Sequence, residues 1–219
     1  MNGQARQRRD TGTPSKRPYH HGNLRAELIE ASFDLLAEHG LSEFSVAKAA
    51  RAVGVSTASP YRHFADRDHL LAAVAAQAAF ELADRIRIDV ESAGSDPGER
   101  FAVTAGTYVR YVADRGAGVN IIFSSPLTRL DQTELSDAGR QLITLLLDLA
   151  EQAGDAPQTE QALLLLERHI VTAHGYVMLY RAGFFASRNA TVETIAERAT
   201  QASRALLRGR TVATLTPHV

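Results

Sequence analysis

Residues 45–64, SVAKAARAVGVSTASPYRHF, decide the fold of this chain. Ser45 is a favoured helix N-cap, and the small residues after it predict a short, slim helix that Gly54 ends. A second short helix is predicted to follow and to reach about Phe64. Two short helices joined by a tight glycine turn indicate a helix-turn-helix, which places its second helix in the major groove of DNA.

Pro60 lies within the second of these helices, where proline usually interrupts the backbone hydrogen bonds. With Thr57 as the N-cap, Pro60 falls at the third helical position, where no intrahelical N–H bond is lost. With Ser56 as the N-cap, one bond is lost and the first turn is expected to be distorted. The sequence leaves both caps open.

The outer face of this second helix carries small polar and basic side chains. A helix that enters the major groove needs short polar groups that reach base edges and donors that reach phosphates. The residues that meet this need are Ser56, Thr57, Ala58, Ser59, Arg62 and His63. The alanines of the preceding helix allow the two helices to approach closely.

Helical periodicity continues on both sides of this unit. Upstream, an apolar stripe begins at Leu24 and the helix is predicted to stop near Gly40. Downstream, Asp66 caps a long helix that extends to about Ser92. Further helical stretches follow, and no segment shows the alternation of a strand. The chain is therefore predicted to be all-α with about nine helices; the later ones lie near residues 101–112, 120–124 (a short helix ended by Pro126), 135–149, 163–181 and 192–206.

Composition and charge favour a cytosolic nucleic-acid-binding protein. The 219 residues include no cysteine, which excludes disulfides and thiolate metal sites, and no apolar run is long enough to cross a bilayer. Residues 1–67 carry ten Lys and Arg against seven Asp and Glu, whereas the remainder carries 14 against 18. Residues 1–18 are polar, basic and expected to be disordered; they are either a DNA-binding arm or a solubilising tail.

Residues 19–80 resemble the N-terminal domain of TetR-type repressors. The resemblance rests on the first helical stripe, the small-residue helix after Ser45, and Tyr61-Arg62-His63-Phe64 before a capped helix. It implies a DNA-binding domain over residues 19–67 and a helical ligand-binding and dimerisation domain over residues 68–219. Pro60 departs from the broadest family pattern but fits the subgroup with a Tyr-His-His-Gly start.

The resemblance also implies roles for individual residues. Ser45 and Lys48 correspond to the backbone-contacting start of the second family helix, and Ser56 to Ser59 with Arg62 to its base-reading face. Tyr61 and His63 correspond to phosphate clamps, although core packing is an equal alternative for Tyr61. Arg67 stands where family members often have a lysine, and its guanidinium suits a phosphate. For Tyr19-His20-His21-Gly22, phosphate contact, local capping and, least favoured, metal binding remain open.

The C-terminal part is expected to hold an apolar effector pocket and a dimer interface. Ile170-Val171-Thr172-Ala173-His174-Gly175 partly resembles a Trp-x-x-x-His-Gly motif of one TetR subgroup, with isoleucine in place of tryptophan. Core packing is the alternative reading for every pocket candidate: Phe101, Tyr108, Phe123, His174, Met178 and Tyr180. The apolar stripe over residues 192–206 suits pairing of the last two helices with those of a second copy.

The function predicted from these features is a ligand-responsive regulator of transcription, by family default a repressor. It would bind a palindromic operator as a homodimer and leave it when a small effector binds. No metal, cofactor or membrane is expected. An enzyme would need a motif such as G-x-S-x-G or H-E-x-x-H, and the sequence has neither. A helical adaptor that binds only protein would not explain a polar, basic helix-turn-helix.

Overall fold

The computed structural model describes residues 23–116, 133–154 and 159–208. Within these ranges the chain is all-α, as predicted, with no strand. The predictions for residues 1–22, for Phe123 and for a helix at 120–124 lie outside the described residues. The α-helices are α1 (Leu24–Glu43), α2 (Val46–Ala52), α3 (Arg67–Ser92), α4 (Pro97–Arg115), α6 (Thr133–Gln152), α7 (Thr159–Arg181) and α8 (Val192–Arg208), with two short 3₁₀ helices at Ser59–Arg62 (η1) and Ala186–Arg188 (η3).

The helix count differs from the prediction of about nine. The described ranges hold seven α-helices, because one expected helix is replaced by η1 and another falls outside these ranges. The breaks at residues 93–97 and near Gly40 are as predicted, although α1 continues past a kink at Gly40, where φ is 74°.

Side-chain caps fix where α2, α3 and α4 begin. The Ser45 hydroxyl accepts from the Lys48 backbone N–H at 3.2 Å, and the Asp66 carboxylate accepts from that of His69 at 2.9 Å. Asp96 caps α4 in the same way, through the Glu99 N–H at 2.7 Å. Each cap satisfies one of the backbone donors that a helix start leaves free.

The predicted α-helix over residues 57–64 is wrong, and Pro60 is the physical reason. Pro60 has no N–H to give to the Ser56 carbonyl, which instead accepts from Ser59 at 3.0 Å in a tight turn. Beyond it, the N–H groups of His63 and Phe64 both donate to the Pro60 carbonyl, at 2.9 and 3.0 Å. The segment is therefore a turn followed by the single 3₁₀ turn η1, of which Pro60 is the buried residue.

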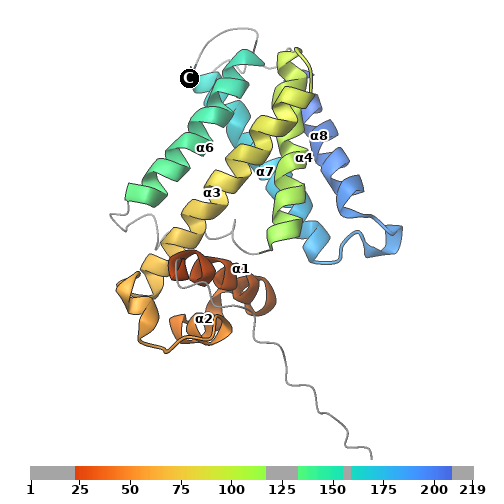
Figure 1. Ribbon diagram of the computed structural model, residues 1–219. Coiled ribbons are helices and arrows are strands. Elements are labelled where there is room, and N and C mark those ends of the chain that lie inside the picture. Colours follow the sequence, from red (N-terminus) through yellow and green to blue (C-terminus); the bar gives the residue numbers. More distant parts are fainter. Residues whose placement is uncertain (1–22, 117–132, 155–158, 209–219) are drawn as a thin grey trace, which may run out of the picture.

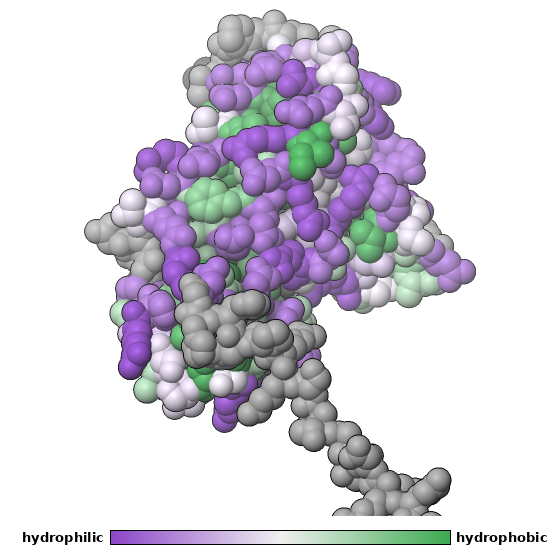
Figure 2. Space-filling view, viewed as in Figure 1, coloured by the Kyte–Doolittle hydropathy of each residue, from purple (hydrophilic) through white to green (hydrophobic). Residues whose placement is uncertain are grey.

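Figure 1 shows a small head of α1, α2 and η1 at one end of a larger body made of α4, α6, α7 and α8. Helix α3 runs from the head into the body and packs against α1, α4 and α6. Its apolar face is rich in buried alanine, which lets three helices approach it closely. In Figure 2 the visible face is mostly hydrophilic, with apolar residues in separate areas of the body.

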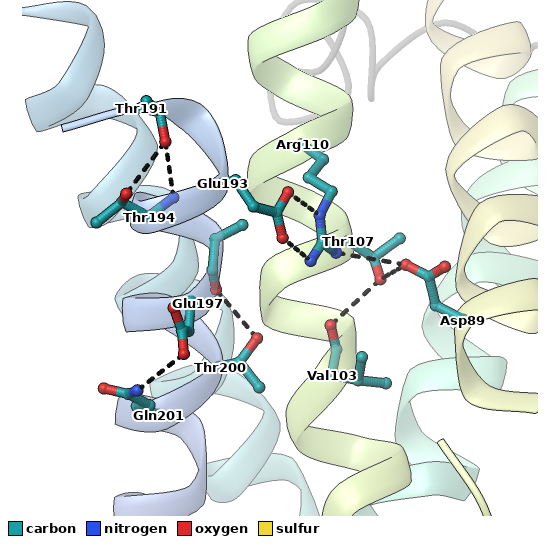
Figure 3. A network of polar contacts seen from close by, with 11 residues as sticks. Asp89, Val103, Thr107, Arg110, Thr191, Glu193, Thr194, Glu197, Thr200 and Gln201 are labelled. Atoms are coloured by element: carbon teal, nitrogen blue, oxygen red, sulfur yellow. Dashed lines mark hydrogen bonds and ion pairs between the residues drawn. The ribbon is translucent and has the colours of Figure 1, made fainter. Parts of the chain in front are cut away.

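Helix α8 packs tightly along α4. A Cβ atom on Gly106 would lie 2.6 Å from the Thr200 hydroxyl oxygen and 3.1 Å from the Ala196 carbonyl, so the helices meet where only glycine fits. Alongside this contact, Arg110 donates twice to Glu193, at 2.9 and 2.7 Å, and lies 3.6 Å from Asp89 of α3 (Figure 3). These polar contacts join α3, α4 and α8 into one unit.

The apolar stripe of α8 is used within the chain. Ile195, Ala196 and Ala199 are fully buried, and α8 packs on α4 and α7. Because α4 and α7 of the same chain cover this stripe, it does not support the predicted pairing with a second copy. Exposed apolar side chains lie instead on α7 and directly after it, at Leu163, Leu164, Val171, Leu179 and Phe184.

Candidate nucleic-acid interface and internal cavity

The turn and η1 present an exposed, acid-free surface on the head. Thr57, Ala58, Tyr61, Arg62 and His63 are all exposed, and the Ser56 and Ser59 hydroxyls hydrogen-bond to each other at 2.8 Å. Residues 44–65 include three basic side chains and no acidic one. A positively charged surface with short polar groups suits the phosphates and base edges of DNA.

Buried groups beneath this surface hold it in place. Phe64 is buried and the Arg25 guanidinium lies over its ring, 5.6 Å from the centroid. Together with Pro60, Phe64 anchors η1 against α1 and α2. Tyr61, for which core packing was the alternative, is exposed instead.

Three further DNA-contact candidates have partners within the chain. The Ser45 hydroxyl caps α2, and the Lys48 ammonium lies 3.6 Å from the Glu43 carboxylate. Arg67 donates to the Leu41 carbonyl at 2.7 Å and to the Phe44 carbonyl at 3.2 Å. These two bonds of Arg67 tie the start of α3 to the end of α1. This role of Arg67 was not predicted from the sequence. Phosphate contact by these residues stays a prediction.

The body contains a cavity of about 280 Å³ between α3, α4, α6 and α7. Its described lining is mainly apolar, with three uncharged polar side chains. The lining residues are Leu82, Ile86, Thr104, Tyr108, Gly139, Leu142, Ile143, Leu146, His169, Ile170 and Ala173. An apolar cavity with a few polar groups is the usual form of a small-molecule site.

His169 is a buried polar group of this cavity, at 3% exposure. Its ring nitrogens lie 2.9 Å from the Thr104 hydroxyl and 2.7 Å from the Ser203 hydroxyl. Thr104 donates its own proton to the Phe101 carbonyl at 2.8 Å, so it accepts from His169 Nε2–H, and Nδ1 accepts from Ser203. Burial lowers the pKa of His169 to about 4, which keeps the ring neutral at pH 7.

Tyr108 is the second polar group of the wall. Its hydroxyl lies 2.7 Å from His174 Nδ1. Burial raises the pKa of Tyr108 and lowers the pKa of His174, which favours the neutral form of both groups. The pair is therefore an uncharged hydrogen-bonding group at the cavity.

The structure brings together only some of the predicted pocket residues. Tyr108 lines the cavity, His174 touches it through Tyr108, and Phe101 lies behind His169, with ring centroids 4.3 Å apart. Met178 and Tyr180 pack against the core instead. His169 was not predicted from the sequence, although its position three residues after Leu166 and four before Ala173 places it on the buried face of α7.

A polar cluster at the end of α4 joins the head to the body. Arg115, at the end of α4, donates to Glu30 of α1 through two nitrogens at 2.9 Å and to Glu81 of α3 at 2.8 and 2.5 Å. Its guanidinium also lies 4.2 Å from the ring centroid of Phe33. Burial would raise the pKa of Glu81, but hydrogen bonds led by that from Arg115 lower it overall.

The backbone at the same junction is equally close. Gly116 has φ of 78°, and a Cβ atom there would lie 2.6 Å from the Cβ of Ala37 in α1. Arg181 of α7 donates to the Gly116 carbonyl at 2.8 Å, and Arg25 of α1 is paired with Glu134 of α6. Helices α3, α4 and α6, which line the cavity, therefore each contact α1 of the head directly.

In the described part of the chain, no group of three His, Asp or Glu side chains could hold a metal ion. No described helix is long and apolar enough to cross a membrane.

Comparisons with known proteins agree with this two-part architecture. Residues 28–74 match the family model of bacterial regulatory proteins of the tetR family, and residues 101–203 match that of tetracyclin repressor-like C-terminal domains. No curated protein matches the chain.

Several solved structures share the fold over nearly their whole length. A protein of unknown function from Rhodococcus sp. RHA1 is 28% identical, with a TM-score of 0.71, 89% of this chain and 98% of that one covered. A TetR-family transcriptional regulator from Bordetella parapertussis 12822 is 21% identical, with a TM-score of 0.60 and coverage of 84% and 95%. FadR from Bacillus subtilis, solved with stearoyl-CoA, is 15% identical, with a TM-score of 0.58 and coverage of 81% and 96%.

Proposed function

The chain belongs to the TetR family of transcriptional regulators, and from that membership we propose that it is an effector-responsive repressor acting in the cytoplasm. In this proposal two copies bind a palindromic operator through their heads, and a small molecule in the body cavity releases them. Residues 19–67 form the DNA-binding part and residues 68–219 the effector-binding and dimerisation part. The observation that carries the proposal is the exposed, acid-free surface of residues 56–63, held by buried Pro60 and Phe64.

The first prediction concerns Arg62, the basic side chain of η1. We expect Arg62→Ala to weaken binding to the DNA upstream of the chain's own gene by at least tenfold. Loss of an arginine contact to a base costs about 1–3 kcal/mol, and a homodimer would lose one such contact in each head. Band shifts at two salt concentrations measure this effect, and wild-type affinity should fall steeply as salt rises.

Arg87→Ala is the matched control for Arg62→Ala. Arg87 is an exposed arginine of α3 paired with Asp84, within the body helices. Its loss should leave DNA affinity unchanged. Equal affinity of Arg62→Ala and wild type, or a wild-type protein that prefers no duplex over heparin, would contradict the proposed DNA-binding surface.

The proposed dimer uses the outer face of α7. Val171 is 65% exposed, and Leu164 and Leu179 are exposed on the same helix. Between Val171 and Leu179, one turn from each, Gly175 has no atom within 4 Å of the place where a Cβ would lie. A mid-helix glycine costs about 1 kcal/mol relative to alanine, and close approach of a second helix would compensate for it.

The second prediction follows from this apolar face. Val171→Glu should convert a dimer into a monomer, because it would place two charges in the apolar contact of a two-fold interface. Light scattering coupled to size exclusion measures the mass. Ile88→Glu is the matched control, since Ile88 of α3 is 62% exposed but lies on another helix. A wild-type monomer, or a dimeric Val171→Glu, would contradict this interface.

The proposed release mechanism is a shift between two arrangements of head and body. Helix α3 lines the cavity with Leu82 and Ile86, and its first residue, Arg67, bonds to the end of α1. If the ligand prefers one arrangement and DNA prefers the other, ligand binding must weaken DNA binding. DNA must then weaken ligand binding by the same factor.

A further inference from the structure

We propose that the body cavity selects an uncharged, largely apolar molecule with a single hydrogen-bonding group and rejects anionic ligands of similar shape. This inference rests on the proposed effector role of the cavity and adds the chemical class of the effector. It excludes ligands whose carboxylate, sulfonate or phosphate group would lie inside the cavity.

The described lining carries no charge. Thr104, Tyr108 and His169 are its only polar side chains, and all the others are aliphatic residues or glycine. Burial lowers the pKa of His169 to about 4, so this ring gives no positive charge near neutral pH. An ionised ligand would lose its hydration without gaining an ion pair from these side chains, and that loss strongly opposes binding.

The existing hydrogen bonds limit how many polar groups a ligand can satisfy. Thr104 gives its proton to the Phe101 carbonyl and accepts from His169, and His169 is held at both ring nitrogens. The Tyr108 hydroxyl shares one bond with His174 and keeps further capacity as donor or acceptor. Tyr108 is therefore the anchor for one neutral polar group, such as a hydroxyl, an amine N–H or a carbonyl.

The size and opening of the cavity fit a small molecule. Its volume of about 280 Å³ is near the lower end of the roughly 300–1,000 Å³ found for ligand pockets. Gly139 leaves open space, because no atom lies within 4 Å of the position of its missing Cβ. Ile143, which is 41% exposed, brings the lining to the surface between α6 and α7.

Two fluorescent probes with the same aromatic skeleton test the charge rule. N-phenyl-1-naphthylamine is uncharged, whereas 8-anilino-1-naphthalenesulfonate adds one sulfonate. The full chain contains no tryptophan, so protein emission does not obscure either probe. We expect the neutral probe to bind at least tenfold more tightly than the sulfonate, and decanol to displace it more effectively than decanoate at pH 7.5.

Variants on one helix tie this binding to the cavity. Gly139→Leu fills the open space and should weaken the neutral probe at least tenfold. Thr144→Leu, on the exposed side of the same helix α6, should leave it unchanged. Ile143→Arg places a cation at the opening and should tighten sulfonate binding several-fold without strengthening the neutral probe. Thermal melting of each variant checks that it is folded, and Ala173→Leu replaces Gly139→Leu if the latter is not.

The outcomes separate this inference from the proposed function. Sulfonate binding as tight as that of the neutral probe, no binding of the neutral probe, or neutral binding unaffected by the folded filling variant would overturn the inference. Band shifts on the same preparations without any probe measure DNA binding by itself. Loss of DNA binding would count against the proposed function, whereas retained DNA binding with the wrong probe selectivity would count against the inference alone.

Discussion

Arg115→Met is expected to lower the free energy of unfolding by about 3 kcal/mol, measured by urea denaturation at pH 7. Arg115 and Glu81 are each 23% exposed. The stability lost with their ion pair should therefore lie between the roughly 0–1 kcal/mol of an exposed pair and the roughly 3–5 kcal/mol lost when one partner of a buried pair is removed. The variant also loses the contact with Phe33, worth about 1 kcal/mol. Methionine keeps much of the apolar stem, which isolates the charge.

A second substitution shows where this cost comes from. Removing Arg115 leaves the Glu81 carboxylate half-buried, with Tyr111 and Gln77 as its remaining hydrogen-bond partners among the described residues. Adding Glu81→Gln removes that unpaired charge, so the double variant should be more stable than Arg115→Met alone. Arg87→Met is the control, since Arg87 and Asp84 form an exposed pair and its loss should cost under about 0.5 kcal/mol. Equal losses at Arg115 and Arg87 would show that the junction is not an energetic link.

The sequence predicted the elements that depend on local signals. Ser45 and Asp66 cap helices where they were expected to, because an N-cap needs only a short acceptor side chain and the next few backbone donors. Pro60 shows the limit of such rules. Its missing N–H allows either a distorted α-helix or a 3₁₀ turn, and the choice depends on how Pro60 and Phe64 are buried against α1 and α2, which is tertiary.

The cavity and the junction were less predictable, because their residues meet across long sequence separations. His169 bonds to Thr104 of α4 and Ser203 of α8, and nothing in the local sequence around α7 indicates those partners. Arg67 had the right charge for a phosphate but is bonded to two carbonyls at the end of α1. For the same reason, the apolar stripe of α8 predicted a buried face without showing that α4 and α7 of the same chain cover it.

The stability of the chain at acid pH should depend on His169 more than on any other histidine of the body. Burial lowers its pKa in the folded chain to about 4, whereas an unfolded histidine titrates near 6.5. Between these values the unfolded chain binds a proton that the folded chain does not, so acid favours unfolding. Stability is therefore full above pH 6.5 and falls as the pH is lowered from 6.5 to 4. At about 1.4 kcal/mol per pH unit, the loss from this group is about 3 kcal/mol.

His169→Gln isolates that contribution, because glutamine can bond to the Thr104 and Ser203 hydroxyls without titrating. Urea denaturation from pH 7 to pH 4 should give a wild-type stability that falls about 3 kcal/mol further than that of the variant, whatever their difference at pH 7. Carboxylates and the other histidines titrate in both proteins and cancel in this comparison. The same substitution at exposed His63 controls for the loss of a histidine as such. Parallel curves for wild type and His169→Gln would mean that His169 takes up a proton in the folded chain, and the neutral wall of the cavity would then have to be abandoned.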